Sequence, residues 1–440
     1  MVLVDLRYLL LGVSCLGAAC AGGARPARVA PADIPALQAQ AAHQPNNPQV
    51  RFRLAAALLA AGRTDTALAV ARAGRLLAPG DALGPLLEGA CQEKEGRPDL
   101  AFATYTEFAT QRPRARGVAA VRAKAQLALR AQAEQTARVA LARESTLTAL
   151  PPEPSTLAVL PLTIAGDSSF QPLSRGLAEL LTSDLALVRT LRLLERVQIG
   201  VLLDELKLGQ TQRADAATAA RVGRLLRAER MVQGVAAITP NGPVRLSAAV
   251  VRGDGTARSG AQANGTFRQL LDLEKQLVFN LAAQLGIQLT EAERQRILQQ
   301  GPKNLAAFLA YSEGLDALDG GDYRAAAQAF GAAAHADPSF QAAQQQQQAA
   351  EAAPTIQQAP GGGGDVITVF EAVAGLPAAT EAAADAALSA AGTDVSPSVA
   401  DALTLNTGGP ATQTELTPAS QGIPSLVQAS TVLRIIFKLP

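Results

Sequence analysis

The chain has 440 residues and an almost balanced charge, with 39 lysines and arginines against 38 aspartates and glutamates. This length predicts two to four domains. Aromatic residues make up only 3% of the sequence. Balanced charge and few aromatics argue against a nucleic-acid-binding protein, because such proteins present a basic face and aromatic side chains on which bases stack.

The N-terminus has the pattern of an export signal. Arg7 precedes an apolar run that continues to Ala19 and is too short to span a membrane. Cys20 follows Leu16-Gly17-Ala18-Ala19, which is similar to a bacterial lipobox. We therefore expect residues 1–20 to form a signal peptide with a lipobox, and Cys20 to carry a lipid anchor.

Two alternatives remain open for this leader. Cys15 follows Leu11-Gly12-Val13-Ser14 and is a second candidate for lipidation. Plain secretion after cleavage near Ala19 or Ala21 is the other alternative. The expected location is the cell envelope, either as an outer-membrane lipoprotein facing the periplasm or as a periplasmic protein.

Beyond the leader, a pattern of glycine, alanine and proline repeats with a displacement of 34 residues. The two copies are Gly62, Ala67 and Pro79, and Gly96, Ala101 and Pro113. In a helical hairpin the glycine would occupy the turn, the alanine would let the two helices approach, and the proline would end the second helix. The period is that of the tetratricopeptide repeat (TPR). We expect residues 48–147 to form two repeats and a capping helix.

A third copy of the pattern occurs near the C-terminal side, with Gly321, Ala326, Phe330 and Pro338. It follows Thr290 and Glu293, whose spacing predicts a capping box at the start of a helix. We expect residues 290–343 to form this helix and a single repeat. Because one repeat cannot bury its own faces, it should pack on a neighbouring part of the chain.

Residues 155–289 alone combine strand and helix signals. The apolar run 157–162 has strand length and is interrupted by a proline. Further strands are expected at 191–194, 231–236 and 244–250, followed by a polar strand up to Thr266. With the intervening amphipathic segments the predicted order is β-α-β-α-α-β-β-β-α. This order indicates a sheet with parallel and antiparallel strands covered by helices.

Four segments of this region carry a family resemblance. They are Ala158-Val159-Leu160-Pro161, residues 174–182, Leu194-Glu195-Arg196 with Leu202-Leu203-Asp204-Glu205, and Met231-Val232-Gln233-Gly234. Together they resemble the CsgG family of curli-assembly lipoproteins and the related N-terminal domain of TolB. The resemblance implies a mixed α/β sandwich fold and a role in assembly or secretion at the outer membrane.

The resemblance does not extend to the secretion pore of the family. A membrane-spanning strand needs about 9–11 alternating residues, and long alternating hairpins are not visible between these elements. A subunit of a CsgG-type channel is therefore an alternative function. A periplasmic small-ligand-sensing module is another, because related α/β folds hold small molecules at strand ends.

The C-terminal part is expected to be mostly disordered. Residues 344–428 begin with a glutamine run and a glycine run, and they read as a low-complexity linker and tail. Residues 429–440 contain a strong strand pattern, which we expect to pair with a sheet edge in this chain or in a partner.

The sequence does not assemble catalytic or metal-binding chemistry. His43 and His335 are its only histidines, which disfavours both a zinc site and a histidine-assisted nucleophile. We expect no enzyme activity, no cofactor and no metal. Glu195-Arg196 is the charged pair of interest: it is either a strand-to-helix connection held by a cap or salt bridge, or a contact with an oligomer or another partner.

These patterns predict an α+β multidomain protein in which all-α repeat segments flank the α/β domain. We expect a non-enzymatic envelope scaffold. Its repeat surfaces would bind protein partners, and its lipid would bind the membrane. The α/β domain could also mediate assembly into a homo-oligomer.

Overall fold

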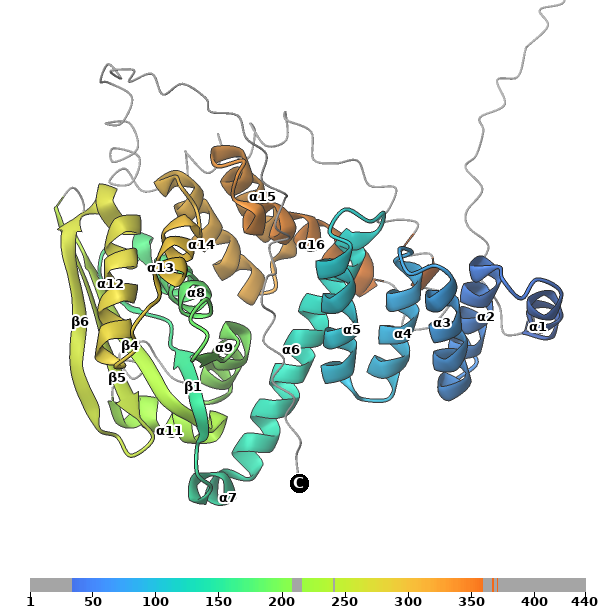
Figure 1. Ribbon diagram of the computed structural model, residues 1–440, viewed down its shortest axis with the longest axis horizontal. Helices are drawn as coiled ribbons and strands as arrows, with labels where there is room; N and C mark the ends of the chain where they lie inside the picture. Colours follow the sequence, from blue (N-terminus) through green and yellow to red (C-terminus); the bar gives the residue numbers. More distant parts are fainter. Residues whose placement is uncertain (1–33, 208–215, 240–241, 359–365, 368–369, 371–440) are drawn as a thin grey trace, which may run out of the picture.

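The computed structural model describes residues 34–207, 216–239, 242–358, 366–367 and 370. Figure 1 shows an array of helices at one end, an α/β domain at the other, and the C-terminal helices between them. The long helix α6 links the array to the α/β domain. The expected leader at 1–20 and terminal strand at 429–440 lie outside the described residues, as does most of the expected tail.

The N-terminal array consists of successive antiparallel helices. They are α1 (Ile34–His43), α2 (Pro48–Ala60), α3 (Thr64–Leu77), α4 (Leu83–Lys94), α5 (Pro98–Gln111), α6 (Val118–Ala142) and the short α7 (Glu144–Ala149). Asn47 caps α2 by accepting backbone N–H groups of Gln49 and Val50, and Pro48 occupies the first turn. Helices α2–α3 and α4–α5 form hairpins at the places where the sequence predicts the first two repeats.

The three predicted turn glycines are required by backbone conformation. Gly62, Gly96 and Gly321 have φ angles of 75°, 72° and 80°. A Cβ atom at each of them would meet nothing within 4 Å, so conformation and not space favours glycine there. The alanines of the pattern, Ala67, Ala101 and Ala326, are fully buried.

The prolines of the pattern follow the second helix of each hairpin. Pro79, Pro113 and Pro338 each lie two residues after the last helical residue of α3, α5 and α15 (Tyr323–Ala336). In each hairpin the glycine therefore lies in the turn, and the proline lies just beyond the end of the second helix.

The α/β domain is built on a mixed sheet. Its strands among the described residues are β1 (Glu153–Val159), β2 (Thr163–Gly166), β3 (Arg192–Leu193), β4 (Ala228–Ile238), β5 (Pro243–Arg252) and β6 (Ala257–Thr266). The order is β3-β1-β4-β5-β6, and β2 continues beside the second half of β4. Pairing is parallel among β1, β2, β3 and β4, and antiparallel from β4 through β5 to β6.

Helices cover both faces of this sheet. They are α8 (Leu173–Leu185), α9 (Arg196–Glu205), α11 (Ala216–Leu226) and α12 (Leu270–Gln284), with 3₁₀ turns η2 (Ser168–Phe170) and η3 (Phe267–Gln269). Leu157 and Val159 face a core shared with α8 and α12. Ala158 and Leu160 face a second core shared with α9 and α11. Burial on both faces explains the continuous apolar run in this segment.

The predicted order of elements holds with one addition. After Pro161 the chain re-enters the sheet as β2, a strand that the predicted order does not contain. The proline ends β1, and Thr163 to Gly166 then pair with Val235 to Ile238 of β4. The predicted capping box is present at the start of α13 (Glu291–Gln299), where Thr290 and Glu293 bond reciprocally.

The prediction of a flexible linker from residue 344 is wrong for its first part. After α14 (Leu305–Asp319) and α15 the chain forms α16 (Gln341–Gln358), an 18-residue helix that contains the glutamine run. Ala343 and Ala350 of α16 are buried against α14 and α15. Ala349, Ala352 and Ala353 are buried in a core with α5 and α6. This helix therefore joins the third hairpin to the N-terminal array.

Candidate functional site

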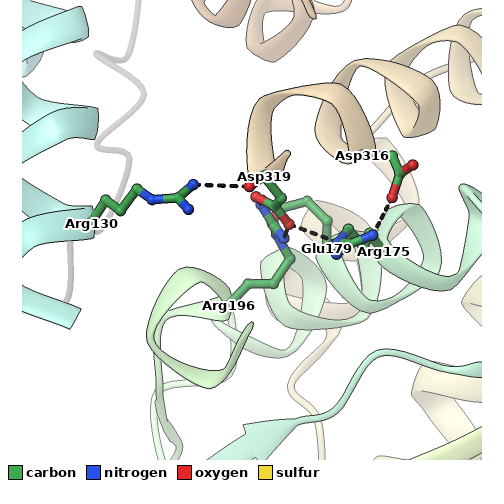
Figure 2. Close-up of polar contacts among 6 residues, drawn as sticks. All are labelled: Arg130, Arg175, Glu179, Arg196, Asp316 and Asp319. Carbon is green, nitrogen blue, oxygen red and sulfur yellow. Dashed lines mark hydrogen bonds and ion pairs between the residues drawn. The ribbon is translucent and has the colours of Figure 1, made fainter. Parts of the chain in front are cut away.

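The charged pair singled out in the sequence lies where three parts of the molecule meet. Arg196 is the first residue of α9, only 6% exposed. Its Nη1 and Nη2 atoms donate to Asp319 Oδ2 and Oδ1 at 2.5 and 3.0 Å, and its Nε donates to Glu179 Oε2 at 3.0 Å. Figure 2 shows these groups converging from the α/β domain and from the end of α14.

Two further arginines complete the cluster around Asp319. Arg175 of α8 approaches Asp319 Oδ2 with its Nε at 2.8 Å and also pairs with Asp316. Arg130 of α6 donates from Nη1 to the backbone oxygen of Asp319 at 2.9 Å. Asp319 is the last residue of α14, where backbone carbonyl groups lack partners within the helix. The arginines therefore pair with the side chains of Asp316 and Asp319 and also compensate the negative end of the helix dipole. We call Arg130, Arg175, Glu179, Arg196, Asp316 and Asp319 the Asp319 cluster.

The ion pairs around Arg196 keep their charges across the physiological pH range, whereas the neighbouring Glu195 titrates within it. Burial lowers the pKa of Arg196, but the carboxylates of Asp319 and Glu179 outweigh it and raise that pKa overall. Glu195, half-buried beside them, has its pKa raised to about 7, first by burial and then by the charge of Glu179. Arg196 therefore stays cationic, whereas Glu195 changes charge near neutral pH.

The structure places Glu195 and Arg196 in contacts within the chain. A partner could reach Arg196 only if the Asp319 cluster opened, because Arg196 is almost completely covered. A partner contact at this pair stays a prediction. The sequence did not indicate Asp319, Arg175 or Arg130 as partners of Arg196. Asp319 lies 123 residues from Arg196, and no local sequence pattern predicts a contact over that separation.

A second polar cluster lies in the core between α8 and α12. Lys275 Nζ contacts Asp184 Oδ2 at 2.5 Å and Glu274 Oε2 at 3.4 Å, and both acids are fully buried. Burial raises the pKa of Asp184 to about 6, against the opposing charge of Lys275. Burial and the neighbouring Asp184 raise the pKa of Glu274 well above its usual range. One lysine therefore neutralises only one of two buried acids, and burial favours the protonated form of Glu274.

Neither cluster has the composition of a metal centre. In the described part of the chain, no group of three His, Cys, Asp or Glu side chains could hold a metal ion. His43 lies in the last turn of α1 and His335 in the last turn of α15, far from each other along the chain. Cys20 lies outside the described residues, so its lipidation stays a prediction.

A surface groove on the N-terminal array is the third candidate site. It has a volume of about 520 Å³. Its lining residues are Gln49, Phe52, Arg53, Gly80, Asp81, Leu83, Arg116, Ile367 and Phe370. The first seven come from the helical array, and the last two come from the segment beyond α16. The groove combines a buried aromatic floor with charged walls, which suits peptide binding.

Comparison with known proteins identifies one part of the chain. The CsgG family model, described as curli production assembly/transport component CsgG, matches residues 158–239. The matched segment runs from β1 through β4 and contains Arg175, Glu179 and Arg196. No curated protein and no solved structure matches the chain. The α/β domain is therefore similar to the CsgG family, and the match leaves out the helices that carry Arg130 and Asp319.

Among the described residues, no helix is both long enough and apolar enough to cross a membrane.

Proposed function

We propose that this chain is a non-enzymatic scaffold of the cell envelope that acts in outer-membrane assembly or secretion. The observation that carries the proposal is the match of residues 158–239 to a curli production assembly/transport component. In this chain the Asp319 cluster holds that segment against α14 of the third hairpin and against α6. The family resemblance supplies the cellular process, and the added helices supply surfaces for protein partners.

The hairpins support the scaffold part of this proposal. We assign α2–α3, α4–α5 and α14–α15 to the tetratricopeptide class on their shared turn glycine, buried alanine and terminal proline. Stacked helical repeats bury a continuous core and leave extended surfaces for partner chains. The groove on α2 and α4 is such a surface, and its polar walls and apolar floor favour a peptide over a small polar metabolite.

The envelope part of the proposal rests on the leader and on Cys20. An acyl chain stabilises membrane attachment by about 0.8 kcal/mol for each buried methylene group. The test is metabolic labelling with a fatty acid, followed by membrane fractionation of cells that make the full chain. We expect Cys20→Ala to abolish labelling and release the protein from the membrane fraction.

Cys15→Ala is the matched control, because it changes a cysteine in the same leader. It should remain labelled and membrane-bound. If Cys15→Ala loses the label and Cys20→Ala keeps it, the anchor is at Cys15 instead. If wild type and both variants stay unlabelled in the soluble cytoplasm, the envelope function is wrong.

The scaffold role is tested by photocrosslinking in intact cells. A photoreactive residue in place of exposed Gln49, in the groove, should give discrete adducts with envelope proteins. The same residue in place of exposed Arg268, on the far α/β domain, is the control and should give none of these adducts. Equal adduct patterns at the two positions would count against a specific binding surface.

A further inference from the structure

We propose that the apolar face of α2, α3 and α4 beside the groove is a docking site for a short amphipathic helix, and that Val366, Ile367 and Phe370 of the same chain occupy this face as an internal ligand. This deepens the proposed scaffold function and rests on it. The structure packs these three residues against the array, where Ile367 and Phe370 also form one wall of the groove. An external partner must therefore displace this segment before it can bind.

Apolar contacts carry the proposal. Val366, Ile367 and Phe370 pack against a buried cluster from α2, α3 and α4. Its members are Phe52, Ala55, Ala56, Ala71, Leu83 and Leu87. Val366 and Phe370 also contact the neighbouring cluster of α5 and α6. The segment therefore bridges two cores of the array at the point where the groove opens.

The spacing of the contacts is that of a helix face. Residues 366, 367 and 370 have helical backbone, and Phe370 is spaced i+4 from Val366 and i+3 from Ile367, the two spacings that bring side chains together on a helix. Helix-in-groove recognition uses anchors of this kind. The motif expected of a displacing partner is accordingly two adjacent aliphatic residues followed, three positions later, by an aromatic residue.

Gly117 shapes the pocket for the aromatic anchor. A Cβ atom at Gly117 would lie 2.3 Å from Phe370 Cε2 and 3.3 Å from Ala82 Cβ. The Phe370 ring thus packs directly on the backbone between α5 and α6, in space that any other residue would fill. The φ angle of 79° at Gly117 also favours glycine. Glycine at this position therefore both permits the turn before α6 and leaves space for the Phe370 ring.

Charge complements these contacts. The guanidinium carbon of Arg116 lies 6.0 Å from the centroid of the Phe370 ring, at the outer limit of a cation–π contact. Arg53 is a second exposed cation of the groove. In the sequence, Asp365 and Glu371 flank the segment, so a peptide carrying it brings two carboxylates to a groove with two arginines.

The covalent connection favours occupation in cis. Helix α16 ends at Gln358, and seven residues separate it from Val366. Because α16 is packed on α6, this connection holds the segment next to the array. A short tether typically gives an effective concentration of about a millimolar. A free peptide of micromolar affinity should therefore bind wild-type protein more weakly than a protein without the internal ligand.

The test uses the purified full chain and a fluorescent synthetic peptide of residues 364–374, followed by fluorescence anisotropy. Wild type should bind the peptide weakly. Ile367→Ala/Phe370→Ala removes the anchors of the internal ligand and should bind the peptide at least about tenfold more tightly, because the competing segment no longer covers the apolar face of the array. A peptide with alanine at both anchor positions should bind neither protein.

Charge reversal distinguishes the groove from other surfaces. Adding Arg53→Glu and Arg116→Glu to Ile367→Ala/Phe370→Ala should weaken peptide binding by at least about tenfold through like-charge repulsion. Arg63→Glu and Arg268→Glu change the same charge at exposed positions outside the groove and should leave binding unchanged. Circular dichroism checks that each variant is folded.

Equal peptide affinity of wild type and Ile367→Ala/Phe370→Ala would overturn the internal-ligand proposal. So would failure of the folded double-anchor variant to bind the peptide at any concentration. If that variant is unfolded, Phe370→Leu, which keeps an apolar anchor, takes its place and should bind the peptide more tightly than wild type. None of these results depends on Cys20 or on location, so they are separate from the outcome of the fractionation test.

Discussion

Arg196 and Asp319 form a bidentate ion pair across 123 residues of sequence, between the start of α9 and the end of α14. The first belongs to the segment similar to the CsgG family, and the second belongs to the third helical hairpin. Nearby, a Cβ atom at Gly176 of α8 would lie 1.9 Å from Ser312 Oγ of α14. This buried ion pair and the close approach of α8 to α14 at Gly176 therefore hold the third hairpin on the α/β domain.

The buried ion pair predicts an unequal response to removal of two acids on the same helix. Asp319→Ala leaves the buried Arg196 with Glu179 alone and should lower the free energy of unfolding by about 3 kcal/mol. Asp316→Ala is the control, because that side chain is 45% exposed and its partner in the described part of the chain is Arg175, which keeps Asp319. It should cost less than about 1 kcal/mol. Urea unfolding measures both, and equal costs would contradict a buried ion pair.

Glu195 predicts a fall in stability as the pH rises. Its pKa is about 7 in the folded chain and 4.5 as a reference value. Between these values the folded state binds more protons than the unfolded state, so the free energy of unfolding decreases with rising pH. At one pKa unit per 1.4 kcal/mol, the loss is about 3 kcal/mol by neutral pH. Asp184, whose pKa is raised to about 6, acts in the same direction.

Glu195→Gln should therefore flatten the dependence of the melting temperature on pH between about pH 4.5 and 7 and make the chain more stable above pH 7. Part of the slope should remain, because Asp184 still titrates. Glu205→Gln, at the exposed far end of α9, is the matched control and should keep the wild-type profile. A Glu195→Gln profile that matches wild type would show that Glu195 ionises normally in the folded chain.

The buried triad of Asp184, Glu274 and Lys275 predicts a rescue by a second substitution. Lys275→Met leaves two buried acids without their cation and should cost about 3 kcal/mol in the free energy of unfolding. Asp184→Asn in the same chain removes the stranded charge and should recover most of that loss. Glu274→Gln should cost less than about 1 kcal/mol, because burial and the neighbouring Asp184 raise the pKa of Glu274 and so favour its neutral form, which glutamine resembles. If the double variant is less stable than Lys275→Met alone, charge burial is not the cause.

The sequence was most informative where local chemistry determines structure. Turn glycines, capping residues and short apolar runs predicted the hairpins and the element order of the α/β domain. Helix α16 was missed because its buried face is alanine, as at Ala343 and Ala350, and its remaining residues are mostly glutamine. Small buried residues give a weak periodic signal, so a helix that depends on its neighbours reads as low complexity.

The candidate sites were less predictable than the fold. Arg196 was singled out from its position after a strand, but its partners Asp319, Arg175 and Arg130 come from three other helices. Asp184 and Lys275 likewise meet only when α8 and α12 pack together. Such clusters depend on tertiary packing, for which one sequence carries no direct signal. The match to residues 158–239 bears out the resemblance to the CsgG family.

The glycines of the hairpins predict two distinct causes of damage. Gly62→Ala places a side chain at a φ of 75° with open space around it, and should cost about 1 kcal/mol from backbone strain alone. Gly62→Asn should cost less, because asparagine tolerates this conformation. Gly89→Ala is different, because its Cβ would lie 2.2 Å from Tyr105 Cζ.

That clash should cost about 1–3 kcal/mol through overpacking, and the free energy of unfolding in urea distinguishes the two causes. Tyr105→Leu shortens the clashing side chain, so Gly89→Ala should be less damaging in a Tyr105→Leu background than in wild type. Gly62→Ala should cost the same in both backgrounds, since no side chain lies near it. If Tyr105→Leu relieves both glycine substitutions, or neither, close packing of α4 on α5 is not what requires glycine at position 89.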